Sequence, residues 1–134
     1  MHPLFEKANS VTGEIIGAAI EVHRDKGPGL IESIYERCFV HELHLRGLFC
    51  ESQQVVRVEY KGLTFEEPLR FDMLVDACVL VENKCVERIL PVHKAQLLSY
   101  MKLLDVPVGL LINFHEPILK DGIHRLMLPQ ANIP

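Results

Sequence analysis

Two apolar stretches decide how this chain folds: Phe71-Asp72-Met73-Leu74-Val75 and Val79-Leu80-Val81-Glu82-Asn83-Lys84-Cys85-Val86. Both consist mainly of Val, Leu, Phe and Met, which is typical of strands in a sheet that is covered on its faces. Asp72, Glu82 and Lys84 interrupt these runs, and an unpaired carboxylate in such surroundings is costly to desolvate. These charges therefore need a compensating partner.

A hairpin that turns at Ala77 would place Asp72 directly opposite Glu82. Because side chains alternate along a strand, Lys84 would share the face of Glu82, while Asn83 would point to the core side and need hydrogen-bond partners there. Two like charges opposite each other destabilise a strand pair unless a divalent cation lies between them, and Mg²⁺ prefers hard oxygen ligands. The pattern therefore indicates a metal site at Asp72 and Glu82. The lysine could hold an attacking water or stabilise charge on a phosphoryl oxygen.

A plainer interpretation stays open for the same three residues. They could form the solvated face of an ordinary antiparallel hairpin, with Glu82 and Lys84 weakly paired. An aspartate followed by a Glu-x-Lys spacing arises often by chance, so these residues alone do not decide between the two interpretations.

The composition indicates one folded domain, residues 1–134, with a core of two layers. The formal net charge of −4 gives no general attraction to a polyanion and argues against tight nonspecific binding of nucleic acid. The amino terminus lacks a basic region followed by a long apolar run, and no stretch approaches the length of a membrane span. We therefore expect a cytoplasmic protein without a membrane partner, whose four cysteines are free thiols.

Hydrophobic periodicity and turn residues predict a series of helices and strands along the chain. In chain order these are a helix from Asn9 or Ser10 to His23, a helix over Glu32 to Arg46 capped by Gly47, a strand over Gln54 to Tyr60, a turn at Lys61-Gly62, a strand over Leu63 to Phe65, the two strands quoted above, a helix from Pro91 to Leu104, a strand over Val108 to Phe114 and a strand over Ile123 to Leu128. A strand that follows a crossover helix normally lies parallel to its neighbour. The order therefore predicts an α/β fold with a mixed central sheet flanked by helices.

His93, Gln96 and Tyr100 recur on roughly one face of the later predicted helix. That face could meet the acidic site, where Gln96 and Tyr100 could hydrogen-bond a substrate phosphate or orient the lysine. A helix that packs Tyr100 into the core, with Gln96 at its margin, explains the same spacing.

Gly29-Leu30-Ile31-Glu32-Ser33-Ile34-Tyr35 forms a Gly-x-x-Glu-x-x-Tyr motif. With this motif the chain resembles a known family, the small bacterial GxxExxY proteins of the PD-(D/E)XK nuclease-like superfamily, which is named after it. Other matching segments spread the similarity over most of the chain, namely Glu42-Leu43, Arg46-Gly47-Leu48, Tyr60-Lys61-Gly62, Asp72, Glu82-Asn83-Lys84, His93 with Gln96-Leu97-Leu98-Ser99-Tyr100, and Gly109 to Phe114.

This resemblance implies a restriction-endonuclease-like core and a nuclease site. Asp72 and Glu82 would bind a divalent metal, Mg²⁺ or Mn²⁺, and Glu32 would contribute from its helix. Lys84 would assist the nucleophilic water, and Gln96 would support the site. Glu32 also has a plainer interpretation, as a first-turn carboxylate favoured by the helix dipole.

Two functions follow as hypotheses. The first is a metal-dependent nuclease that hydrolyses phosphodiester bonds of DNA or RNA through Asp72, Glu82, Lys84, Glu32 and Gln96. The second is a noncatalytic nuclease-fold module for protein interaction or nucleic-acid binding, which the small size and negative charge favour. Because no appended DNA-binding element is visible, an active form could need a homodimer or a protein partner.

Overall fold

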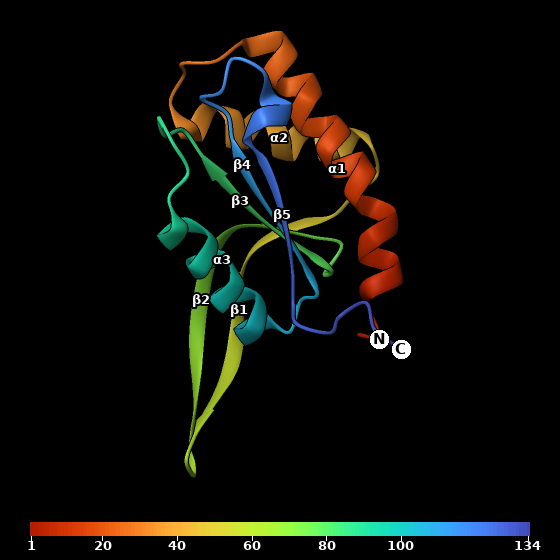
Figure 1. Cartoon of the computed structure of the whole chain (residues 1–134), viewed down its shortest axis with the longest axis vertical. Coiled ribbons are helices and arrows are strands. Elements are labelled where there is room, and N and C mark those ends of the chain that lie inside the picture. The colour runs from red at the N-terminus through yellow and green to blue at the C-terminus, as the bar shows by residue number, and fades with distance from the viewer.

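The structure of the chain is a computed structural model that describes all 134 residues (Figure 1). It contains three α-helices, a short 3₁₀-helix and one five-stranded sheet. The elements in chain order are α1 (Phe5–Lys26), α2 (Glu32–Leu45), β1 (Cys50–Tyr60), β2 (Leu63–Val75), β3 (Val79–Lys84), α3 (Pro91–Leu104), β4 (Val108–Asn113), η1 (Leu119–Gly122) and β5 (Ile123–Met127). None of the helices is long and apolar enough to cross a lipid bilayer.

The strands follow one another across the sheet in the order β1-β2-β3-β4-β5. Strands β1, β2 and β3 form an antiparallel meander, and β4 and β5 are also antiparallel. Helix α3 connects β3 to β4, and these two strands are parallel. This arrangement confirms the predicted mixed sheet and the predicted parallel pairing after the crossover helix.

Helices cover the sheet on both faces. Helices α1 and α2 pack on one face, and α3 packs on the other (Figure 1). Strand β4 lies between the two layers, and all six of its residues are buried. Its unbroken apolar sequence therefore reflects burial on both faces, as predicted.

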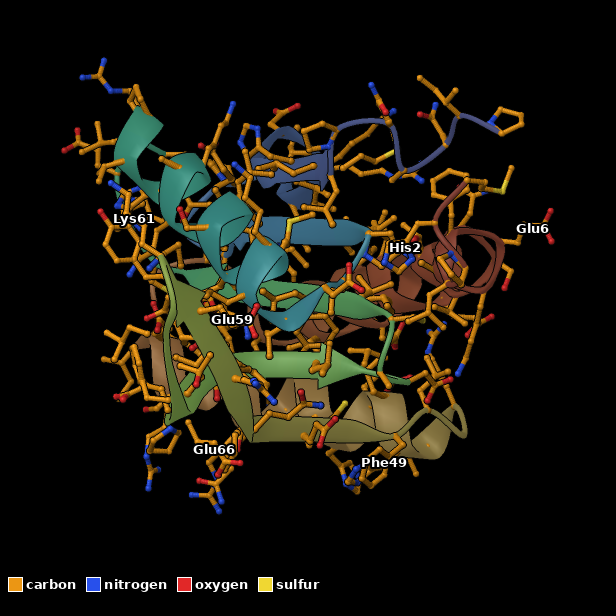
Figure 2. The ribbon with its side chains drawn as sticks, turned by 90° about the horizontal axis from the view of Figure 1, so that it is seen from below. His2, Glu6, Phe49, Glu59, Lys61 and Glu66 are labelled. Carbon is orange, nitrogen blue, oxygen red and sulfur yellow. The ribbon has the colours of Figure 1, made fainter.

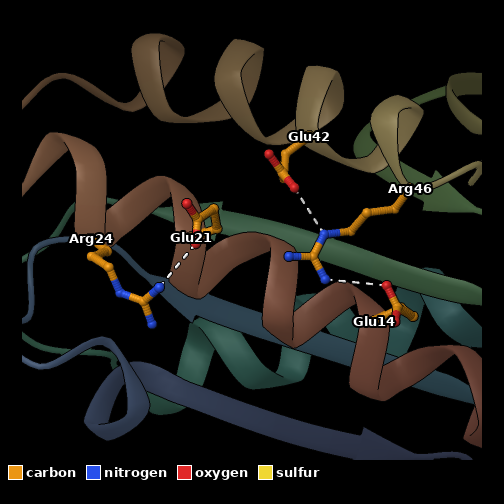
Figure 3. A network of polar contacts seen from close by, with 5 residues as sticks. All are labelled: Glu14, Glu21, Arg24, Glu42 and Arg46. Carbon is orange, nitrogen blue, oxygen red and sulfur yellow. Dashed lines mark hydrogen bonds and ion pairs between the residues drawn. The ribbon is translucent and has the colours of Figure 1, made fainter.

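Helix α1 lies against α2, and one arginine bonds to both helices. Arg46, at the end of α2, bonds Glu42 at 2.9 Å on its own helix and Glu14 of α1 at 3.2 Å (Figure 3). Gly17 leaves room for it, because a Cβ at that position would come within 3.0 Å of the guanidinium. The arginine thus links the two helices on one face of the sheet.

Helix α3 approaches the opposite face closely at Gly109 of β4. A Cβ built on this glycine would lie 2.5 Å from Sδ of Met101 and 3.2 Å from the side chain of Leu97, and both of these residues are buried. The glycine is therefore required by the close approach of the helix to the strand.

Helix α1 begins at Phe5, earlier than the predicted start at Asn9 or Ser10. Neither residue caps the helix, and the hydroxyl of Ser10 donates to the carbonyl of Lys7 within it. The imidazole of His2 instead accepts a hydrogen bond from the amide of Leu4 at 3.0 Å. Leu4 and Phe5 also pack against the core, which extends the helix by about one turn.

Strand β2 is longer than predicted. Instead of two short strands, residues Leu63–Val75 form one strand of 13 residues that includes Pro68. Only Met73, Leu74 and Val75 of this strand pair with β3. Pro68 therefore lies where β2 has a single neighbour, and an edge position of this kind tolerates the missing amide.

Candidate metal centre

The hairpin between β2 and β3 has the predicted register. Val75 pairs with Val79 and Met73 with Val81, which centres the turn on Ala77. The observed ladder ends at Met73 and Val81. Beyond it the backbone amide of Asn83 donates to a carboxylate oxygen of Asp72 at 2.7 Å, and this bond orients the aspartate.

A bulge in β2 re-aims the Asp72 side chain. The register against β1 shifts between Glu51, which faces Leu74, and Gln53, which faces Arg70. Phe71 and Met73 are two residues apart, yet they lie in the opposite apolar layers of the sheet, so the regular alternation fails at Asp72. Bulges commonly re-aim a side chain next to a functional site.

Helix α2 brings two further carboxylates to Asp72. Glu32 is its first residue, and Glu36 lies one turn later on the same face. Carboxylate oxygens of Glu32, Glu36 and Asp72 all lie within 4.8 Å of one another. We call these three residues the acidic triad; it is the only group of three or more such ligands in the chain that comes this close together.

Tyr35 fixes the start of α2 and thereby the position of Glu32. Its ring is buried and stacks on Phe114 at a centroid distance of 4.7 Å. Its hydroxyl donates to the carbonyl of Gly27 and accepts from the amide of Leu30 at 3.1 Å. The loop before α2 is therefore tied to the core. Within the Gly-x-x-Glu-x-x-Tyr motif, the tyrosine positions the backbone and the glutamate offers the ligand.

In the absence of a cation, each carboxylate of the site makes ionisation of the neighbouring carboxyl groups less favourable. Burial and the charge of Asp72 raise the pKa of Glu32 above its usual value. Burial, followed by the charges of Asp72 and Glu32, raises the pKa of Glu36 to about 7. Burial and the charge of Asp72 raise the pKa of Glu82 to about 8. A divalent cation would reverse the sign of these repulsions.

Glu82 and Lys84 lie beside the acidic triad. Glu82 is outside the group of three, although the charge of Asp72 acts on it. The charge of Lys84 acts in the opposite direction and lowers the pKa values of Glu32 and Glu82. Lys84 itself forms no ion pair with a carboxylate. Its ammonium is therefore free to meet a bound anion.

Asn83 points to the core side, as predicted, and is fully buried. Its amide nitrogen lies 3.2 Å from the sulfur of Met73, and its amide oxygen has no hydrogen-bond partner. The side chain is thus only partly satisfied.

The structure does not connect Gln96 to the acidic triad by a hydrogen bond. Gln96 is exposed on α3. His93, on the same helix, accepts a hydrogen bond from the amide of Leu90 at 3.0 Å and so caps α3. Tyr100 lines a groove with residues of β1 and β2 that include none of the carboxylates above.

Two members of the acidic triad line a small pocket of about 210 Å³. Glu36 and Asp72 line it together with Glu51, Ser52 and neighbouring apolar side chains. Sequence reasoning missed Glu36. A usable signal existed, because Glu36 follows Glu32 by one helical turn and must share its face.

The sheet order, the flanking helices and this acidic cluster define a restriction-endonuclease-like fold. Residues 9–126 match the family model of the PD-(D/E)XK nuclease superfamily. The match spans most of the chain, and the protein belongs to this superfamily.

The chain is also similar to a solved structure, the crystal structure of SSO0001, with a TM-score of 0.52 and 22% sequence identity. The similar region covers 75% of this chain and 52% of that one, so this chain matches about half the length of its structural neighbour. This likeness supports the fold alone. No curated protein sequence matches the chain.

Proposed function

We propose that this protein is a divalent-metal-dependent nuclease that hydrolyses phosphodiester bonds of DNA or RNA. The acidic triad carries this proposal, because α2 and β2 bring three carboxylates within 4.8 Å of one another beside Glu82 and an unpaired lysine. Oxygen donors in this number suit Mg²⁺ or Mn²⁺. The Gly29 to Tyr35 motif further supports a place among the GxxExxY proteins, with residues 1–134 as one domain.

Each residue would have a separate role at the site. Glu32, Glu36 and Asp72 would hold the metal, with Glu82 as a further carboxylate beside them. A bound divalent ion would supply charge neutralisation at the phosphate and make a water molecule a better nucleophile. Lys84 would place its ammonium against negative charge that develops on a phosphoryl oxygen. Asn83 would keep Asp72 in place through its backbone amide.

The structure gives Gln96 less support as a site residue than it gives the carboxylates and Lys84. Because it is exposed and not bonded to the other site residues, it would act on bound substrate and not on the metal. The four free thiols support a reducing compartment, and so a cytoplasmic location.

Cleavage of labelled nucleic acids tests the proposal. Single- and double-stranded DNA and RNA are incubated with the wild-type protein and Mg²⁺ or Mn²⁺, in parallel with chelator. We expect cleavage of at least one substrate class that chelator abolishes and that Asp72→Asn lowers by about 100-fold or more. Glu67→Gln, a neutralised carboxylate that is exposed on β2 and outside the site, should cleave at the wild-type rate.

Two results would count against the proposal. Equal cleavage by wild type and Asp72→Asn would show that the activity does not come from this site. No cleavage of any of the four substrates by the metal-loaded protein would favour the noncatalytic nuclease-fold module instead.

A further inference from the structure

The hairpin of β1 and β2 extends beyond the rest of the sheet. Strand β3 reaches only Met73, Leu74 and Val75 of β2, so the distal part of the hairpin is a ribbon of two strands (Figure 1). We call residues 53–70 the ribbon. A two-stranded ribbon is only marginally stable in water by itself. A partner that adds strands to it would stabilise it.

One face of the ribbon is apolar and exposed. In the observed register Tyr60 pairs with Leu63 and Val58 with Phe65, so these four side chains share a face. Tyr60 is 63% exposed, Leu63 58% and Phe65 43%. Exposed apolar residues that cluster in this way indicate an interaction surface.

The outer edge of the ribbon, along β1, has no neighbouring strand. Strand β1 is the edge of the sheet, and its 11 residues contain neither proline nor glycine. Edge strands are commonly blunted by lysine, proline or a bulge, which prevents pairing with another chain. Between Gln53 and Tyr60 the only charged side chains of β1 are Arg57 and Glu59.

The charge of the ribbon does not fit a nucleic acid. Arg57, Lys61 and Arg70 are balanced by Glu59, Glu66 and Glu67, so three positive charges meet three negative ones. Figure 2 views the molecule from below, from the end at which the tip of the ribbon lies, and labels Glu59, Lys61 and Glu66 on it. A surface of zero net charge gives no attraction to phosphates, and a protein partner fits it better.

We propose that β1 pairs in antiparallel orientation with β1 of a second copy of this chain, about a two-fold axis at Val58. Two-fold pairing requires that opposite residues share a face, so the axis must pass through a residue pair. With the axis at Val58, Arg57 lies opposite Glu59 of the second copy, and Glu59 lies opposite its Arg57. An axis at Arg57 or at Glu59 would place like charges opposite each other.

The side chains of this register fit one another. Arg57 and Glu59 lie 3.5 Å apart on their own strand and remain 70% and 68% exposed, which leaves each free to meet a second partner. Val56 would lie opposite Tyr60 of the second copy, a favourable pairing of a β-branched with an aromatic residue. Because Phe65 neighbours Val58, the two apolar faces would join into one strip across four strands.

A groove lies where this register places the tip of the second ribbon. The turn Lys61-Gly62 would come beside Val55 and Gln54 of the other copy. These two residues line a groove of about 750 Å³ together with Glu67 and Tyr100. Val55 is 64% exposed, so the incoming turn would cover its side chain.

The mass in solution and a charge exchange test the pairing. Sedimentation of the wild-type protein between about 1 and 100 µM should show a mass that rises from 15.3 kDa toward twice that value. Arg57→Glu and Glu59→Arg should each weaken dimerisation by about tenfold or more, because each places like charges opposite each other on both sides of the two-fold axis. An equimolar mixture of the two variants should dimerise again, since opposite charges then face each other.

The mixture separates pairing between two chains from an effect confined to one strand. Disruption of the Arg57 to Glu59 contact within one strand predicts no recovery on mixing. Lys7→Glu, an exposed charge reversal on α1 and outside the ribbon, should keep the wild-type mass, and circular dichroism should show that all variants are folded. A wild-type mass of 15.3 kDa at every concentration overturns the proposal. Single variants that dimerise like wild type, or a mixture that does not dimerise, overturn the register.

Discussion

Neutralising Glu82 should stabilise the metal-free protein at neutral pH. Burial and the charge of Asp72 raise the pKa of Glu82 to about 8, from 4.5 in the unfolded chain. The folded state therefore binds more protons than the unfolded state between these values, and the free energy of unfolding falls as the pH rises through this window. Glu82→Gln removes this titrating group with little change of shape.

The size of the effect follows from the same values. At pH 7.5 Glu82 is ionised in the unfolded chain, whereas the folded protein keeps it mostly protonated. Since a difference of one in pKa corresponds to about 1.4 kcal/mol, this lowers the free energy of unfolding at pH 7.5 by on the order of 4 kcal/mol. We expect Glu82→Gln to be more stable than wild type by roughly 2–4 kcal/mol at pH 7.5, and to unfold roughly 6–16 °C higher. At pH 5, close to the pKa of Glu82 in the unfolded chain, the two proteins should differ by less than about 1 kcal/mol.

Urea unfolding followed by circular dichroism, in chelator at pH 5, 6, 7 and 8, measures the difference. The control is Glu67→Gln, which removes an exposed charge from β2 and should follow the wild-type pH dependence. The same pH dependence in Glu82→Gln and wild type, or a lower stability of Glu82→Gln at pH 7.5, would contradict a raised pKa at Glu82.

Three other substitutions have defined outcomes. Lys84→Ala should lower cleavage by about 100-fold and leave Mn²⁺ affinity within about threefold of wild type, because the lysine acts on the phosphate and not on the ion. The cleavage assay and calorimetry measure the two effects separately, and a parallel loss of metal binding would argue against this role. Tyr35→Phe should lower the free energy of unfolding by about 1–2 kcal/mol, since it keeps the stacking on Phe114 and removes both hydroxyl hydrogen bonds. Unchanged stability in urea would contradict the anchoring of the loop before α2 by this hydroxyl. Gly109→Ala should destabilise the protein by about 1–3 kcal/mol, because its Cβ would clash with Met101. The control Gly13→Ala on α1, where nothing lies within 4 Å of a new Cβ, should be neutral or stabilising by up to about 1 kcal/mol. Equal thermal shifts for both variants would show that the close approach of α3 to Gly109 does not affect stability.

Local patterns were sufficient to predict the central part of the fold. The register of the β2–β3 hairpin follows from the period-two alternation around Ala77, and the bounds of α3 follow from Pro91 at its start and Pro107 beyond its end. The parallel pairing of β3 and β4 follows from the crossover helix between them.

The sequence patterns did not predict two features that depend on contacts between distant residues, the length of β2 and the bulge at Asp72. The length of β2 could not be inferred from propensity, because Glu66, Glu67 and Pro68 interrupt its apolar pattern and only pairing with β1 makes it one strand. The bulge at Asp72 likewise depends on how β1 and β2 fit together. It determines that Asp72 meets α2, so the acidic triad could not be derived from the alternation of β2 alone.

The candidate site was therefore predicted in part. Asp72 and Glu32 belong to the acidic triad, and Glu82 and Lys84 lie beside it. Glu36 was missed although its spacing from Glu32 was visible in the sequence. The role of Gln96 came from resemblance, and its exposed position gives it no contact with the triad.

The claim on which the proposed function depends is that the acidic triad binds a divalent cation. Titration of Mn²⁺ into the metal-free wild-type protein and into Glu36→Gln, by calorimetry at pH 7.5, measures this most directly. We predict saturable binding by wild type and an affinity lower by about tenfold or more in Glu36→Gln, with Glu67→Gln unchanged. Absence of binding to wild type, or equal affinity in wild type and Glu36→Gln, would contradict a metal centre at Glu32, Glu36 and Asp72.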